Sequence, residues 1–120
     1  MVFIKILYLC NENFFKTQKL KKTVSNEKKL VKAYGQSAAV AILKRLDDIY
    51  VAENMAEIFE LPGNYHPLSG NLKGKFACNV SRNYRIIFEP ATRPLPVNEH
   101  NMLIYEEIQE ITILSIEDYH

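Results

Sequence analysis

A histidine in the middle of the chain is the first residue that could do chemistry. His66 lies in residues 65–70 (YHPLSG), which contain the proline and glycine typical of a loop. An imidazole titrates near neutral pH, as general acid–base catalysis requires. Considered alone, the residue also fits an exposed loop histidine without a function. His66 is therefore a candidate proton-transfer group.

Arg85 is the second candidate, because it stands in an otherwise apolar run at 84–88 (YRIIF). A guanidinium on a half-buried strand is rarely left without a partner. We expect Arg85 either to pair with a carboxylate or to face a site where a phosphate binds.

The last three residues bring a carboxylate, a phenol and an imidazole together, as Asp118, Tyr119 and His120. If the strand before them packs beside the strand of Arg85, these groups lie close to Arg85 and to His66. Such a set suits RNA cleavage by the neighbouring 2′-hydroxyl. One group takes the hydroxyl proton, another protonates the leaving 5′-oxygen, and cations stabilise the charge on phosphorus. This chemistry requires no metal ion and no cofactor.

Common catalytic and nucleotide-binding motifs are missing from the sequence. It contains no Walker loop, GxGxxG, HExxH, GxSxG or paired CxxC, which removes the commonest nucleotide, zinc and acyl-transfer functions. Cys10 and Cys78 each lie in or beside a strand-like apolar run. We expect two buried thiols in a reducing cytoplasm rather than a disulfide.

The charge is balanced overall but unevenly distributed. A formal net charge of +1 does not by itself indicate a nucleic-acid binder. Residues 61–88, however, contain no Asp or Glu and include Lys73, Lys75 and Arg82. These three are candidates for RNA binding, although each alone fits a solvated surface charge. Residues 11–22 are also lysine-rich; a solvated helix face is the favoured interpretation there, with ribosomal RNA contact as the alternative.

The first half of the chain predicts a strand followed by helices. Residues 2–9 are dense in β-branched and aromatic side chains and predict a first strand, while residues 11–22 fit either a loop or a ragged helix. Ser25 is placed to cap a helix over 26–33, and Gly35 to end it. The clearest helix starts at Ser37. Its apolar residues follow a single face and leave four charged residues for water: Ala39, Ile42, Leu43, Leu46, Ile49 and Tyr50 inside; Lys44, Arg45, Asp47 and Asp48 outside.

The second half predicts strands. A further helical turn over 54–60 ends at Leu61-Pro62-Gly63, and runs at 75–80 and 84–88 form an antiparallel hairpin. Prolines make 91–107 an irregular excursion before a last strand at 110–116. With 120 residues and 48% hydrophobic residues, the chain predicts one domain over 1–120. We expect an α+β fold, with the first strand and the helices on one face of a mainly antiparallel sheet.

Three stretches together resemble the HigB-like branch of the RelE/ParE toxin superfamily: residues 61–74 (LPGNYHPLSGNLKG), the strand ending 83–90 (NYRIIFEP) and the terminal 117–120 (EDYH). Residues 27–35 (EKKLVKAYG) are similar to longer members. The resemblance covers most of the chain from about Ser25 onward, and its order of motifs is more specific than any one of them.

The resemblance implies a cytoplasmic toxin that cleaves messenger RNA in the ribosomal A site and is held inactive by a cognate antitoxin, a small helix-turn-helix protein. It implies proton transfer by His66 or His120, phosphate binding by Arg85, an orienting role for Asp118 and substrate contact by Tyr119.

Two features depart from the family pattern, and two other readings stay open. Ser69 stands where lysine is frequent, so one expected cation is missing, and residues 91–107 are longer than in the shortest members. One alternative is a non-enzymatic ParE-like toxin that binds a protein such as gyrase, or a member with weakened catalysis. The other is an α+β domain without toxin function.

Overall fold

The N-terminal segment is a helix, and the predicted first strand is wrong. The computed structural model describes residues 2–118, with side chains from Lys5 onward, and α1 covers Val2–Cys10. Tyr8 is fully buried, whereas Ile6 and Leu7 are about half exposed. A short apolar run fits either a strand or one face of a helix, so its surroundings decide. The strand position beside the sheet is taken instead by Phe15, which forms a parallel bridge with Ile113.

Three helices follow, and side-chain caps explain where the first two begin. The first is α2 (Gln18–Ser25), which starts at Thr17, whose hydroxyl accepts a hydrogen bond from the Leu20 N–H. The second is α3 (Glu27–Tyr34), which is capped by the Asn26 carboxamide rather than by Ser25, and it ends at Gly35 as expected. The third is the predicted long helix, α4 (Gln36–Val51).

Three of the four charged residues of α4 that were predicted to face water are partly buried, namely Arg45, Asp47 and Asp48, and only Lys44 is exposed. The Arg45 side chain is only 17% exposed, and it lies against the sheet rather than in water. Its Nε donates to the Asn79 carbonyl at 3.3 Å, and its guanidinium also lies 4.0 Å from the Asp48 carboxylate. A long side chain can bury its stem and still satisfy its head group, which the apolar periodicity does not reveal.

The sheet has four antiparallel strands in the order of the chain. These are β1 (His66–Pro67), β2 (Phe76–Asn79), β3 (Tyr84–Pro90) and β4 (Ile111–Asp118). The predicted hairpin is confirmed as β2 and β3, and the predicted last strand as β4. A β-bulge interrupts the pairing of β3 with β4. Phe88 pairs with Ile113 and Ile87 with Ser115, so Leu114 is the additional residue of the bulge.

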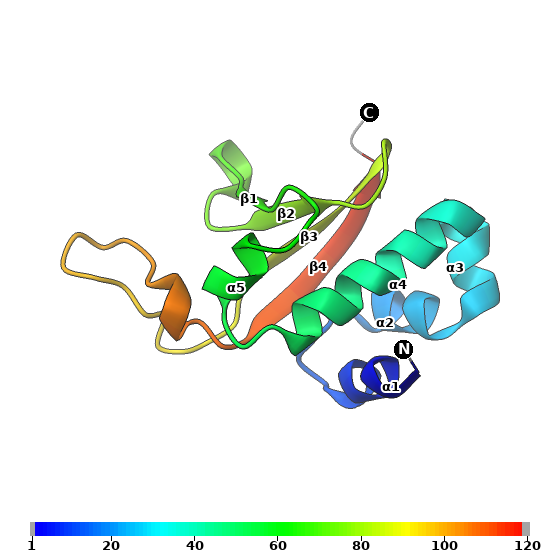
Figure 1. Cartoon of the computed structure of the whole chain (residues 1–120), viewed down its shortest axis with the longest axis horizontal. Helices are drawn as coiled ribbons and strands as arrows, with labels where there is room; N and C mark the ends of the chain where they lie inside the picture. The colour runs from blue at the N-terminus through cyan, green and yellow to red at the C-terminus, as the bar shows by residue number, and fades with distance from the viewer. Residues whose placement is uncertain (1, 119–120) are drawn as a thin grey trace.

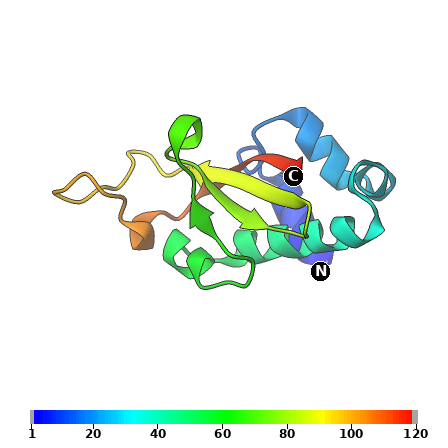
Figure 2. The same ribbon diagram turned by 90° about the horizontal axis from the view of Figure 1, so that it is seen from above.

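The helices α4 and α5 (Met55–Phe59) cover one face of this sheet (Figures 1 and 2). The core between them joins helix residues such as Ile42 and Leu46 to the strand residues Ile86, Phe88 and Ile116. Cys78 is buried in this layer as predicted, but Cys10 is exposed at the end of α1, and both cysteines are free. The α+β prediction with helices on one face is therefore confirmed, apart from the first strand.

Residues 91–107 form an arm that extends away from the body of the molecule (Figures 1 and 2). A bridge between Val97 and Leu103 closes the arm, and a short 3-10 helix, η2 (Tyr105–Glu107), ends it. The Tyr105 ring packs against Phe59 and Phe76, with ring centroids 4.8 and 6.0 Å apart. These contacts fix the base of the arm to the domain. No helix among the described residues is long and apolar enough to span a bilayer.

Candidate functional site

The loop that carries His66 is held tightly against α4. The Asn79 N–H donates to the Gly63 carbonyl at 2.7 Å, and the Arg45 Nε binds the Asn79 carbonyl. Gly63 has a φ of +134°, and a Cβ at this position would lie 2.9 Å from the Arg45 Nε. Only glycine fits this close approach without strain. Because of these contacts, the segment leading to His66 has a defined position beside β2.

The hydrogen bond of His66 determines which nitrogen of its ring carries the proton. Its Nδ1 lies 2.6 Å from the Asn64 carbonyl oxygen. A carbonyl can only accept, so Nδ1 is the donor, and in the neutral ring Nε2 has a free lone pair. Nε2 is then the nitrogen able to take a proton. The neighbouring Tyr65 is buried in the core; burial raises the pKa of its phenol far above the ordinary value, so Tyr65 stays neutral.

Register places His66 and Arg85 on the same face of the sheet. His66 is opposite Ala77, and two residues further along β2 Asn79 is opposite Arg85. Cross-strand partners and residues two apart share a face, which here is the face away from α4. We call this the outer face, with His66, Asn79, Arg85 and Glu117 as its residues. Two strand spacings and two residue steps separate the Cα atoms of His66 and Arg85 by about 12 Å.

Arg85 faces a carboxylate, which was one of the two arrangements expected from the sequence. Glu117 is its direct partner on β4, and the Arg85 Nη2 lies 3.8 Å from the Glu117 Oε1. The Ser115 hydroxyl donates to the other carboxylate oxygen of Glu117 at 3.0 Å. The Glu117 side chain is 46% exposed, so the pair is reachable from solvent. A phosphate approaching Arg85 would meet Glu117 at the same place.

Asp118 and Arg85 point to opposite faces of the sheet, because successive side chains of a strand alternate between its two faces. It pairs with Tyr84, and by alternation its side chain leaves the sheet on the face of Tyr84, opposite that of Arg85. Asp118 therefore lies near the candidate site along the chain but points to the other side of the sheet. Tyr119 and His120 lie outside the described residues.

The predicted RNA-binding cations surround the hairpin. Lys75 directly precedes β2 and lies two residues before Ala77, so its side chain belongs on the outer face. Lys73 follows the short 3-10 helix η1 (Gly70–Leu72) and is exposed, and Arg82 is exposed in the turn between β2 and β3. Ser69 is exposed at the start of η1. Lys75 is the cation closest in the pairing pattern to His66.

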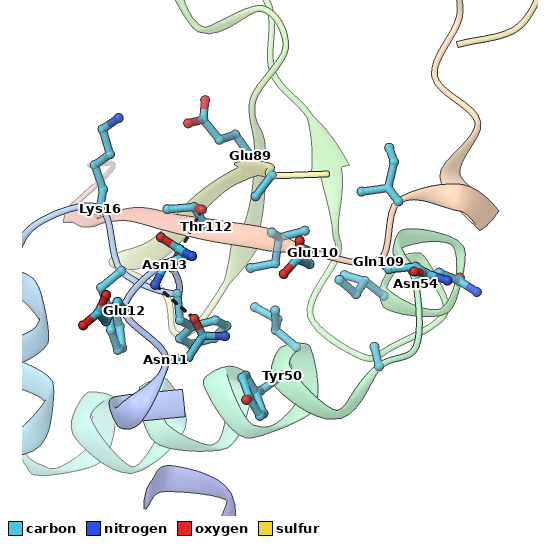
Figure 3. Close-up of a pocket in the computed structure, with 18 residues that line it drawn as sticks. Asn11, Glu12, Asn13, Lys16, Tyr50, Asn54, Glu89, Gln109, Glu110 and Thr112 are labelled. Atoms are coloured by element: carbon cyan, nitrogen blue, oxygen red, sulfur yellow. Dashed lines mark hydrogen bonds between the residues drawn. The ribbon is translucent and has the colours of Figure 1, made fainter. Parts of the chain in front are cut away.

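The pocket shown in Figure 3 lies at the other end of the sheet, with a volume of about 510 Å³. Polar side chains from residues 11–16, from the ends of α4 and β3 and from the start of β4 line it, among them Asn11, Glu89 and Thr112. It contains none of the predicted site residues. The Thr112 hydroxyl donates to the Asn13 carbonyl at 2.9 Å, so part of this wall is occupied by the chain's own contacts.

Comparison with known proteins defines the class of fold. No protein-family model matches the chain, and no curated protein matches it. Among solved structures, the YoeB–YefM complex from Staphylococcus aureus matches with a TM-score of 0.52, covering 87% of this chain and 92% of that chain at 14% identity. YoeB has a RelE-like fold, and the α+β architecture described above is accordingly RelE-like.

Glu117 is the residue of the outer face that sequence reasoning did not select. The signal for it was the spacing of the buried isoleucines in the last strand, Ile111, Ile113 and Ile116. An odd step from 113 to 116 keeps both residues on the core face only if the strand contains a bulge. With that bulge, Glu117 must point outward, to the side of Arg85.

Proposed function

We propose that the chain is the toxin of a type II toxin–antitoxin system, of the HigB-like branch, and that it cleaves messenger RNA on the ribosome. The observation that carries this proposal is a histidine with a free Nε2 on the same sheet face as an arginine, within a RelE-like fold. The similar structure is a complex of YoeB with YefM, which favours a cognate antitoxin as the partner of this chain as well.

The proposed chemistry assigns roles to three groups on the outer face: His66, Arg85 and Lys75. The His66 Nε2 takes the proton of the substrate 2′-hydroxyl, whose oxygen attacks the adjacent phosphorus. The Arg85 guanidinium binds the phosphate oxygens and stabilises the extra negative charge of the phosphorane. Lys75 adds positive charge on the same face. The bond from phosphorus to the 5′-oxygen then breaks, which leaves a 2′,3′-cyclic phosphate.

The leaving 5′-oxygen must receive a proton from a second group. His120 and Tyr119 are the candidates on chemical grounds, since each can donate a proton to an alkoxide. His66 and His120 can exchange the roles of base and acid. Asp118 then orients a partner and does not touch the phosphate, because its side chain points to the face of the sheet opposite Arg85. All steps are proton transfers and charge stabilisation, so the proposal includes no metal.

Mapping of messenger RNA 5′ ends after brief induction tests the proposal. Wild-type chain should produce new cuts within translated codons, and His66→Ala and Arg85→Ala should abolish them. His100→Ala is the matched control, because His100 lies on the arm with a side chain 72% exposed. Thermal unfolding of each purified variant separates a loss of fold from a loss of chemistry. Cuts that persist in both site variants would show that the outer face is not the cleavage site.

A second candidate function is a toxin that binds a protein target without cleaving RNA. The observation that favours it is the pairing of Arg85 with Glu117, since a guanidinium already facing a carboxylate is less available to a phosphate. Growth arrest on induction without new 5′ ends, retained in His66→Ala, would decide for this function.

A further inference from the structure

Positive charge is concentrated in one short region outside the outer face. Seven of the lysines lie between positions 16 and 32, together with a single acid, Glu27. These residues carry a formal charge of +6. Because the whole chain has a net charge of +1, all other residues together carry −5. The lysines are Lys16, Lys19, Lys21, Lys22, Lys28, Lys29 and Lys32.

Six of these lysines lie on the helices α2 and α3, and Lys16 lies just before α2. Six of the seven are exposed, and only Lys21 is partly buried. Val24 and Leu30 are fully buried beneath them, so the apolar residues of α2 and α3 are used for packing. Among residues 5–118, the ion pairs within 4.0 Å are Arg45–Asp48, Arg85–Glu117 and His100–Glu99, and none includes a lysine. The charge of this region is therefore not neutralised by the protein.

Two of the lysines line a shallow groove at the junction of the two helices. Lys28 and Lys32 lie one turn apart on α3, and the rest of the wall is formed by Ser25, Asn26, Glu27, Val31 and Gln36. Like charges four residues apart destabilise a helix. An anion bound between them would relieve that repulsion. Glu27 is the one acid in this lining, so the two lysines leave the groove with a formal charge of +1, and Gln36 adds an uncharged hydrogen-bonding group.

The helical pair also meets the other positive segment of the chain. The Tyr34 ring, at the end of α3, packs edge-on against the Tyr84 ring at the start of β3, with centroids 5.1 Å apart. Tyr84 is next to Arg85 and belongs to residues 61–88, which contain no Asp or Glu. Tyr84 points to the face opposite Arg85, so a long polyanion on α2 and α3 would reach the outer face only by passing around the end of β3.

We propose that α2 and α3 form a docking surface for the phosphate backbone of a folded RNA, separate from the cleavage chemistry of the outer face. The choice of RNA among polyanions rests on the proposed function. A regular array of lysines without base-reading groups suits contact with phosphates rather than sequence recognition. The shape and charge of an RNA double helix are what such a surface recognises.

An anionic membrane is the less suitable partner for these helices. Helices that lie in a membrane interface place a free apolar face into the lipid, beside their lysines. The exposed large apolar residues of the described chain are Ile6, Leu7, Val40, Val51, Leu95, Val97 and Met102, and none of them lies in α2 or α3.

Binding of a 2′-O-methyl RNA hairpin, measured by fluorescence anisotropy over a range of salt concentrations, tests the docking surface. The double variant Lys28→Gln/Lys32→Gln removes two exposed charges from the groove. Lys5→Gln/Lys44→Gln is its matched control, with the same change in net charge on α1 and α4. Each phosphate contact contributes about 0.9 to the slope of log affinity against log salt, so the groove variant should lower the slope by about 2. The control should leave it nearly unchanged.

Three results would overturn the inference: no binding by the wild-type chain, an equal loss of slope in both double variants, or tighter binding to vesicles of phosphatidylcholine and phosphatidylserine than to the hairpin. The 2′-O-methyl group prevents cleavage, so the measurement does not depend on His66 or Arg85. Hairpin binding without messenger RNA cuts in cells would refute the proposed function alone. Cuts in cells together with any of the three overturning results would refute the docking surface alone.

Discussion

Replacing Glu117 by glutamine should strengthen binding of an RNA strand to the outer face. In the folded chain, the Glu117 carboxylate lies 3.8 Å from Arg85 Nη2 and accepts a hydrogen bond from Ser115. Glutamine has the same shape and retains an oxygen that can accept from Ser115. The substitution therefore removes mainly the negative charge that competes with a phosphate for Arg85.

The size of the effect follows from the exposure of the pair. The Arg85 and Glu117 side chains are 23% and 46% exposed, and the Arg85 Nη2 and Glu117 Oε1 are 3.8 Å apart. Such partly exposed ion pairs contribute about 0.2–1 kcal/mol. We therefore expect the free energy of unfolding to fall by no more than about 0.5 kcal/mol. Removing the competitor should lower the Kd of a phosphate strand by about twofold to fivefold.

Anisotropy of a labelled 2′-O-methyl oligoribonucleotide measures this Kd without cleavage. Glu99→Gln is the matched control, since it removes one negative charge from a side chain 87% exposed on the arm. The gain should disappear in the double variant Arg85→Ala/Glu117→Gln, because it acts through the arginine. Weaker binding by Glu117→Gln would mean that the carboxylate positions Arg85 for the phosphate. A gain that survives without Arg85 would refute the reasoning altogether.

Three further predictions concern buried and exposed side chains of the domain. Tyr8→Phe should raise the free energy of unfolding in urea by up to about 1 kcal/mol, because the buried Tyr8 hydroxyl makes no hydrogen bond to a described residue; a clear loss would show that it has a partner. Burial raises the pKa of Cys78 from 9.0 to about 11, so the unfolded thiol ionises first as the pH rises. The free energy of unfolding is therefore unaffected by this thiol below pH 9 and falls by about 2–3 kcal/mol as the pH rises toward 11. Urea titrations of Cys78→Ala should lack this pH dependence. A thiol reagent should modify Cys10 at once in the native protein and Cys78 only in denaturant, and rapid reaction of both would contradict the burial of Cys78.

Much of the fold could be predicted because its determinants are local. A three-residue turn between two apolar runs specifies the hairpin, and one apolar face specifies α4. The N-terminal run could not be predicted in this way. Its nine residues satisfy strand and helix patterns equally well, and the outcome depends on Phe15 occupying the position beside β4. Competition between two segments for one sheet edge is a tertiary effect, which propensity does not contain.

The candidate site shows the same division between local and tertiary information. Residue types alone identified His66 and Arg85, and the sheet register then put both on one face. The carboxylate opposite Arg85 depended on one inserted residue. Without the bulge at Leu114, the strand would exchange its two faces beyond that point, and Asp118 rather than Glu117 would point to the outer face. Such a shift would also move Ile116 out of the core, so the apolar pattern of β4 disfavours it. The isoleucine spacing therefore determines which acid meets Arg85, and Glu117→Gln is the substitution that tests this consequence most directly.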